Sequence, residues 1–172
     1  MAQTDWTTIF GDKATDLEQG DSWHLEFDDS VEPKSPKPGW KEYIRNTGAR
    51  FRCSKCGRSW PSNRVMVVFH MHLISGQGVV KVRRIRQNCK KCASAPMEKP
   101  EIPPENISIL MDNLVKKIRI KCYGENLDGG FKPPQTLEVK SPHEPAHCEA
   151  CKLGICERNS APHNPSTYKF FF

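Results

Sequence analysis

Residues 50–92 read RFRCSKCGRSWPSNRVMVVFHMHLISGQGVVKVRRIRQNCKKC and contain two C-x-x-C pairs separated by two apolar runs. The pairs are Cys53 with Cys56 and Cys89 with Cys92. The apolar runs and the glycine-containing turn between them predict a β-hairpin that carries one pair at each of its free ends. Four thiolates at this spacing are typical of a structural Zn²⁺ site, and unpaired buried cysteines or disulfides are the alternatives. We therefore expect one zinc ion to close the hairpin.

The overall composition favours metal crosslinks over a large apolar core. The chain has 172 residues, 8 cysteines, 14 prolines and a mean hydropathy of −0.65. Residues 1–21 lack the basic and apolar regions of a secretory signal, so we expect a cytosolic protein whose thiols stay reduced. No run approaches the roughly 20 apolar residues that span a bilayer, so this chain as given is not expected to be an integral membrane protein.

Alternating and β-branched residues predict the strands. Trp23–Phe27 alternates with polar residues, which indicates a half-buried strand. Val65–Phe69 is apolar throughout, as in a strand covered on both faces. Val79–Gln87 is its expected hairpin partner, and the charges along it are typical of an edge strand that resists aggregation. Thr136–Val139 is expected to form one further short strand.

Two segments have helical periodicity. Asp5–Asp16 carries apolar residues at helical spacing and predicts a short amphipathic helix. Ile107–Cys122 has a continuous apolar stripe, which predicts the main helix of the domain. Asn106 is the expected N-cap, and Gly124 is placed to end this helix.

A second group of metal-ligand residues lies near the C-terminus: His143, Cys148, Cys151 and Cys156. Three cysteines within nine residues, with histidines beside them, predict a second zinc site. The fourth ligand is open on the sequence alone. We prefer His143, because the loop after it can turn back, and keep Cys122 and His147 as alternatives.

The charge distribution indicates an anionic partner. The net charge is +6, yet residues 50–92 contain eleven cations and no acid. A basic face of this kind suits anionic lipid or RNA. The candidate residues are Arg58, Lys81, Arg83, Arg84, Arg86, Lys90 and Lys91. His70 and His72 lie on one side of the expected strand, where we interpret them as ordinary strand-end residues because four cysteines already complete the nearby site.

Catalysis is not expected from these motifs. Thiol redox chemistry needs a C-x-x-C that opens a helix inside a βαβ unit, and that context is absent. A zinc hydrolase needs an open coordination position, whereas a four-cysteine site is closed. We therefore expect no enzyme and no small-molecule substrate.

Several motifs together resemble a known family. The motifs are RFRCSKC-x-RSW, GW-x-x-Y, FHMH, G-x-V-x-V-R, Q-x-C-x-x-C, ENI with NLV, CYG and CEAC-x-LGIC. The set resembles the receptor-transporting proteins, whose domain is called the 3CxxC zinc finger, in register from about Trp6 to Cys156. The resemblance covers nearly all of the chain that we expect to be ordered.

The resemblance implies an accessory protein at the cytosolic face of the endoplasmic reticulum or plasma membrane. Such proteins bind G-protein-coupled receptors, odorant and taste receptors in particular, and promote their delivery to the cell surface. An interferon-induced member restricts viruses and binds RNA, which makes an RNA-binding antiviral effector the alternative function. Family members usually end in a hydrophobic anchor, and we expect no such segment within the 172 residues as given, which a truncated chain, an isoform or an anchorless relative would explain.

These observations predict an α+β fold. We expect a small zinc-stabilised domain in which an antiparallel sheet is flanked by one main helix and carries two zinc sites. Residues 1–45 are expected to be an N-terminal packing segment with a proline-rich loop, residues 46–156 the zinc-finger domain, and residues 157–172 a disordered tail.

Overall fold

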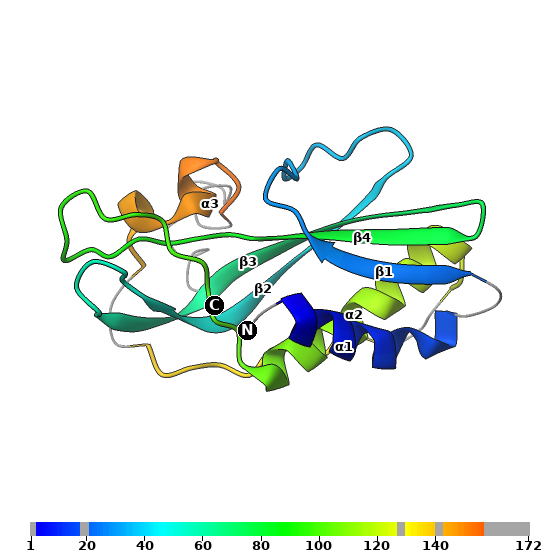
Figure 1. Ribbon diagram of the computed structural model, residues 1–172, viewed down its shortest axis with the longest axis horizontal. Helices are drawn as coiled ribbons and strands as arrows, with labels where there is room; N and C mark the ends of the chain where they lie inside the picture. The colour runs from blue at the N-terminus through cyan, green and yellow to red at the C-terminus, as the bar shows by residue number, and fades with distance from the viewer. Residues whose placement is uncertain (1–2, 18–20, 127–129, 140–142, 157–172) are drawn as a thin grey trace.

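The computed structural model describes residues 3–17, 21–126, 130–139 and 143–156, which form one mixed sheet with helices on both sides (Figure 1). The elements are α1 (Gln3–Lys13), the 3-10 turn η1 (Ala14–Leu17), β1 (Ser22–Phe27), β2 (Lys41–Arg52), β3 (Ser59–Ile74), β4 (Gln77–Arg84), α2 (Pro104–Tyr123), the 3-10 turn η2 (Pro145–His147) and α3 (Glu149–Lys152). The predicted α+β class is confirmed.

The sheet has the strand order β1-β4-β3-β2. The predicted hairpin is confirmed as β3 and β4, which pair antiparallel, and β2 extends it on the other side of β3. However, β1 pairs in parallel with β4, so that Trp23 lies opposite Gly78 and Phe27 opposite Val82. The interpretation of β4 as an edge strand is therefore wrong. The cations of β4 lie on an inner strand, because β1 from the N-terminal segment pairs with the side of β4 that would otherwise be the sheet edge.

Strand β3 separates two apolar clusters. Its residues Val65–Phe69 are all buried, which confirms the expectation of a strand covered on both faces. Val65, Val67 and Phe69 belong to the large cluster beneath α1 and α2, whereas Met66 and Val68 pack with the residues around α3. Because side chains alternate along a strand, one strand supplies both cores.

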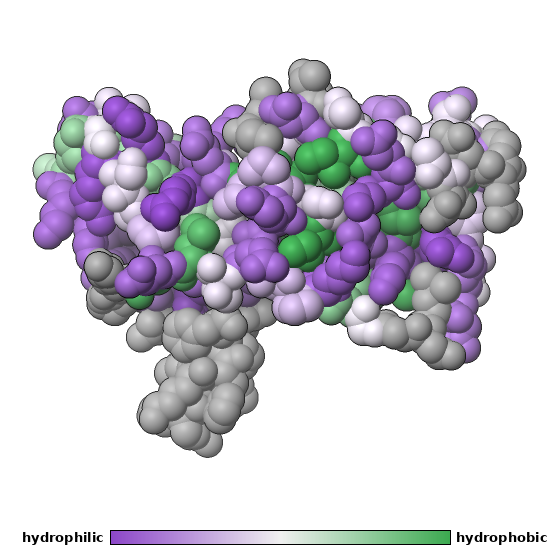
Figure 2. All heavy atoms as spheres, turned by 90° about the horizontal axis from the view of Figure 1, so that it is seen from below, coloured by the Kyte–Doolittle hydropathy of each residue, from purple (hydrophilic) through white to green (hydrophobic). Residues whose placement is uncertain are grey.

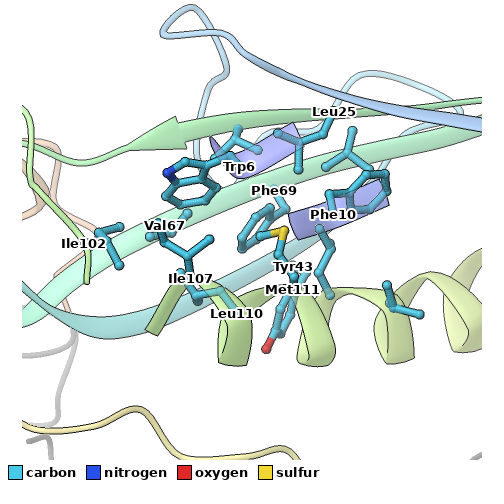
Figure 3. Close-up of a cluster of buried hydrophobic side chains, with 14 of the residues drawn as sticks. Trp6, Phe10, Leu25, Tyr43, Val67, Phe69, Ile102, Ile107, Leu110 and Met111 are labelled. Atoms are coloured by element: carbon cyan, nitrogen blue, oxygen red, sulfur yellow. The ribbon is translucent and has the colours of Figure 1, made fainter. Parts of the chain in front are cut away.

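The larger cluster joins the N-terminal helix to the main helix. Trp6 and Phe10 of α1 lie over the sheet beside Phe69, and Met111 and Leu110 approach from α2 (Figure 3). Both predicted helices are confirmed. The described residues among 1–45 thus share their core with the later part of the chain, while the exact domain boundaries stay a prediction.

At the two ends of α2, the expected N-cap is wrong and the expected C-terminal glycine is confirmed. The helix begins at Pro104 with Pro103 at the N-cap position, so Asn106 is not the N-cap. Proline is favoured in the first turn because its missing N–H has no intrahelical partner there. Asn106 is instead fully buried. Gly124 ends the helix in the left-handed region, at φ 67°, as expected.

Two further segments differ from the sequence-based expectation, and a third lies outside the described residues. Strand β2 was not predicted, although Tyr43, Thr47, Ala49 and Phe51 do alternate along it as buried residues. Residues 136–139 are extended but form no strand with the described residues. The expected disordered tail, residues 157–172, lies outside the described part of the chain.

The surface on the side of α1 and α2 is mostly hydrophilic, with separated apolar patches between the charged side chains (Figure 2). No described helix has both the length and the apolar character that crossing a bilayer demands.

Gly78 provides a test of the parallel β1–β4 pairing. A Cβ at this position would lie 2.2 Å from Trp23 Cδ2, so we expect Gly78→Ala to lower the free energy of unfolding by roughly 2 kcal/mol. Gly11, in α1, has open space around it, so Gly11→Ala should instead raise stability by about 1 kcal/mol. Urea denaturation followed by tryptophan fluorescence measures both. Equal effects of the two substitutions would contradict the pairing.

Candidate metal centres

The first candidate centre lies where the β2–β3 turn meets the loop after β4. The turn supplies Cys53 and Cys56, and the loop supplies Cys89 and Cys92. Their four sulfur atoms all lie within 4.8 Å of one another. The hairpin thus brings together the two C-x-x-C pairs that the sequence singles out.

Backbone amides shape both halves of this centre. In the turn, the Lys55 N–H donates to Cys53 Sγ at 3.3 Å, and the Lys91 N–H donates equivalently to Cys89 Sγ at 3.4 Å. Gly57 has a φ of 77°, a conformation that glycine adopts without steric cost. Such amides stabilise negative charge on sulfur, so both pairs are prepared to bind as thiolates.

The sulfur spacing fits a zinc ion. The distance from Cys53 Sγ to Cys92 Sγ is 3.8 Å, and that from Cys56 Sγ to Cys89 Sγ is also 3.8 Å. Sulfurs at about 2.3 Å from a tetrahedral zinc lie about 3.8 Å from each other. The four residues therefore have the spacing of a closed, structural site.

The thiol pKa values show why a cation belongs here. Burial alone would raise the pKa of Cys89, but hydrogen bonds from the Lys91 amide and the neighbouring thiols outweigh burial and lower this pKa to about 7. Contact with the Cys56 thiol, followed by burial and contact with the other two sulfurs, raises the pKa of Cys92 to about 12. The Cys92 thiol therefore stays protonated at neutral pH unless a cation lies beside its sulfur, and a bound metal ion provides one.

The second candidate centre surrounds α3. Its members are His143, Cys148, Cys151 and Cys156, whose ligand atoms also lie within 4.8 Å of one another. The Nε2 atom of His143 lies 3.3 Å from Cys151 Sγ and 3.7 Å from Cys156 Sγ. An imidazole nitrogen and a thiolate on one tetrahedral zinc are separated by about 3.5 Å, so this set fits as well. Contact with the Cys156 thiol, together with burial, raises the pKa of Cys148, which again favours a cation.

The alternative ligands lie elsewhere. His147 is not among the residues whose ligand atoms cluster with these sulfurs, and its Nδ1 atom lies 2.8 Å from Asn88 Oδ1. Cys122, on α2, packs against the large apolar cluster, where burial raises the pKa of its thiol. Of the three candidates for the fourth ligand, the structure brings only His143 to the cysteines.

Glu149 connects the second centre to the sheet. It is 7% exposed and accepts hydrogen bonds from the Arg86 backbone N–H at 2.9 Å and from the Arg83 guanidinium at 3.1 Å. Although burial raises the pKa of this carboxyl, the hydrogen bonds from Arg86 and the charges of Arg86 and Arg83 lower it overall. The sequence pattern did not indicate this residue, and its position directly after Cys148 was the only available signal.

Four of the seven expected anion-binding cations are engaged inside the fold. Arg83 and Arg86 bind Glu149, and Lys81 Nζ lies 3.2 Å from Asp28. Arg84 is buried, with its guanidinium 3.8 Å from the centre of the Phe27 ring. The acidic partners come from segments far away in sequence, so the run of cations alone did not reveal them.

The other three expected cations, Arg58, Lys90 and Lys91, lie in the loops of the first centre. Arg58 stacks over Trp60, 4.8 Å from the ring centre. A groove of about 830 Å³ runs between the two centres. Its lining includes Arg50, Arg58, Trp60, Arg64, Lys90 and Glu138. The basic surface is therefore smaller than the sequence indicated: Arg58 and Lys90 line this groove, and Lys91 lies exposed outside it.

The two strand histidines serve the fold. His70 Nε2 lies 2.7 Å from Glu42, and the His72 ring stacks on Trp40 at 3.8 Å. Neither belongs to a metal-ligand cluster among the described residues.

Comparison with known proteins identifies the type of domain. Residues 46–154 match the model of a zinc-binding domain of the 3CxxC zinc-ribbon family. Mus musculus receptor-transporting protein 3 is 37% identical over 162 residues, a match that covers 90% of this chain and 33% of the relative. Mus musculus receptor-transporting protein 2 is 35% identical, and the match covers 90% of this chain and 71% of the relative. Homo sapiens receptor-transporting protein 4 is 34% identical, and the match covers 88% of this chain and 63% of the relative.

This chain thus spans about a third of the length of receptor-transporting protein 3. No solved structure matches it. Together, the zinc-binding family match and the two cysteine-rich clusters identify the metal as zinc.

Cysteine substitutions separate the two centres. Cys89→Ser should remove one zinc ion and abolish cooperative unfolding, because the metal contributes on the order of 10 kcal/mol to folding. Cys151→Ser should remove the other ion and loosen the region of α3, leaving the hairpin folded. Cys122→Ser is the matched control and should retain both ions. Native mass spectrometry counts the zinc, and thermal unfolding followed by circular dichroism measures cooperativity.

Complete unfolding by both Cys89→Ser and Cys151→Ser would instead show a single interdependent metal core. Loss of a zinc ion from Cys122→Ser would show that this thiol is a ligand.

Glu149→Gln tests the connection between the second centre and β4. We expect a loss on the order of 3 kcal/mol in the free energy of unfolding, because Arg83 and Arg86 lose the charge that compensates them. The exposed Glu144 is the control, and Glu144→Gln should change stability by less than about 0.5 kcal/mol. Urea denaturation at neutral pH measures both, and equal values would contradict the proposed connection.

Proposed function

This chain belongs to the receptor-transporting protein family, and we propose that it is a zinc-stabilised adaptor that binds G-protein-coupled receptors and promotes their delivery to the plasma membrane. The observation that carries the proposal is the match to receptor-transporting proteins over about nine tenths of the chain. The proposal extends to receptors of the odorant and taste class, which the motif resemblance implies.

The two centres have a structural role in this proposal. Cys53, Cys56, Cys89 and Cys92 bind one zinc ion, and His143 with Cys148, Cys151 and Cys156 binds the other. Each set offers four ligand atoms, which completes a tetrahedral shell and leaves no position for substrate. The closed shells support a binding function over catalysis.

The charge distribution suggests how the adaptor is oriented. We propose that it works at the cytosolic face of the endoplasmic reticulum and plasma membrane. Cytoplasmic receptor loops are enriched in Lys and Arg, which suits the acidic residues near the N-terminus. The exposed cations around the first centre, such as Lys91, suit anionic lipid headgroups.

Co-expression with an odorant receptor tests the proposal. Cells that express the chain, alone or fused to a membrane anchor, should label more strongly for surface receptor than cells with empty vector. Cys89→Ser should remove this gain, and Cys122→Ser should retain it at equal expression. Surface receptor no higher than with empty vector in either format would contradict the adaptor function.

RNA binding is the second candidate, favoured by the groove between the centres. Four cations, Arg50, Arg58, Arg64 and Lys90, line this groove together with Trp60, a combination that suits phosphates and a stacked base. Two carboxylates, Glu138 and Glu144, line it as well, so we prefer the receptor function. RNA affinity that falls steeply with salt and is weakened by Arg58→Ala with Lys90→Ala would favour RNA instead.

A further inference from the structure

A short extended segment of the chain is held by side-chain amides. We call residues 131–139 the strap, and it runs back along α2, from the C-terminal part of that helix toward its start (Figure 1). The strap is extended and belongs to no helix or strand. Its half-buried residues are Phe131, Pro134 and Leu137, and its other six residues are exposed. The half-buried residues thus recur at every third position, which is the period of a polyproline II helix.

Three asparagines each bind both backbone groups of one strap residue. Asn113 Oδ1 accepts from the Lys132 N–H at 2.8 Å, and its Nδ2 donates to the Lys132 carbonyl at 2.9 Å. Asn106 does the same with Gln135, at 2.7 Å and 3.0 Å.

Asn63, on β3, completes the row by binding both backbone groups of Leu137, at 2.8 Å and 2.7 Å. A side-chain amide presents one donor and one acceptor, as a neighbouring strand would, so these contacts recognise backbone and not sequence.

The floor of this groove is polar and buried. Asn106 and Asn113 are both fully buried, although they are amides on the inner face of α2. Gly48 makes room for the strap, since a Cβ there would lie 2.9 Å from the Gln135 carbonyl oxygen and 2.7 Å from Asn63 Oδ1. Buried amides are costly without a partner, so the groove requires an extended backbone in it.

Backbone groups make most of the hydrogen bonds that hold the strap in this groove. Its side chains add an ion pair of Lys132 Nζ with Asp112 at 2.8 Å, and the Phe131 ring lies 6.0 Å from the Tyr43 ring and 5.1 Å from Lys117 Nζ. An extended segment with proline in the middle and apolar residues three positions apart can make the paired backbone hydrogen bonds.

We propose that this asparagine-lined groove is a peptide-binding site for an extended, proline-containing segment of a separate protein, and that the strap occupies it in cis. The partner segment carries apolar residues at the positions of Phe131 and Leu137 and a proline at the position of Pro134. It displaces the strap and takes over the hydrogen bonds to Asn63, Asn106 and Asn113. The site is independent of the receptor assignment, because it depends only on these contacts.

The tethered strap competes with any partner. A segment joined to its own groove has an effective concentration in the millimolar range, so a free peptide binds the unaltered chain only weakly. Weakening the strap without altering the groove should therefore reveal the site. Gln135→Pro does this, because it removes the N–H that donates to Asn106 Oδ1 and keeps the extended conformation.

The test uses a fluorescein-labelled peptide with the sequence of residues 130–139, GFKPPQTLEV. Fluorescence anisotropy should show binding to the Gln135→Pro chain that is about tenfold tighter or more than to Gln135→Ala, the matched control that keeps the N–H. Adding Asn106→Ala to Gln135→Pro should abolish this binding. A peptide that itself carries Gln135→Pro should bind at least about tenfold more weakly.

Three results would overturn the proposal. They are no peptide binding by the Gln135→Pro chain, binding that Asn106→Ala leaves unchanged, and a concentration-dependent dimer of the Gln135→Pro chain, which would assign the groove to the strap of a second copy. Zinc content establishes that each variant is folded.

If Gln135→Pro fails to retain its zinc, a nitrogen-15 labelled unaltered chain is titrated with millimolar unlabelled peptide. The amides of Lys132, Gln135 and Leu137 should then move toward their free-peptide positions, and unchanged signals would equally overturn the proposal.

Discussion

The clustering of four cysteine sulfurs within 4.8 Å of one another is the constraint on which the rest of this structure depends. Contact with the Cys56 thiol, followed by burial, raises the pKa of Cys92 to about 12, so this sulfur binds as a thiolate only beside a cation. A zinc ion provides the positive charge and ties the β2–β3 turn to the loop after β4. Its contribution of roughly 10 kcal/mol is comparable to the whole net stability of an ordinary domain. The long β2–β3–β4 sheet can therefore extend well beyond its helix-covered core.

The second centre stabilises the opposite face of the same sheet. Met66 and Val68 of β3 pack with the buried cysteines around α3, while Glu149 binds Arg83 and Arg86 at the end of β4. The helices α1 and α2 cover the other face. The first metal centre thus joins the β2–β3 turn to the loop after β4, and the second holds α3 against the sheet. This division leaves a basic groove between the centres and an asparagine-lined groove beside α2.

Local signals in the sequence predict the features that depend on near neighbours. The spacing of the cysteines predicts both metal centres, and the apolar stripe of α2 predicts the main helix. Long-range pairing leaves no such signal. The parallel pairing of β1 with β4 joins segments about 55 residues apart, so the charges of β4 alone predict an edge strand. The same charges predict an anionic partner because Glu149 and Asp28 are distant in sequence.

The position of Asn106 before the apolar stripe predicts an N-cap, because its buried contact with Gln135 is equally non-local.

The arrangement of two zinc ions in two different shells is tested most directly by zinc K-edge X-ray absorption on the purified chain, with the metal counted by native mass spectrometry. Two ions per chain are predicted, with ligands that together comprise seven cysteine sulfurs and one histidine nitrogen. The sulfurs should lie at about 2.3 Å from zinc. A single ion per chain, or an average shell made of sulfur alone, would contradict the arrangement.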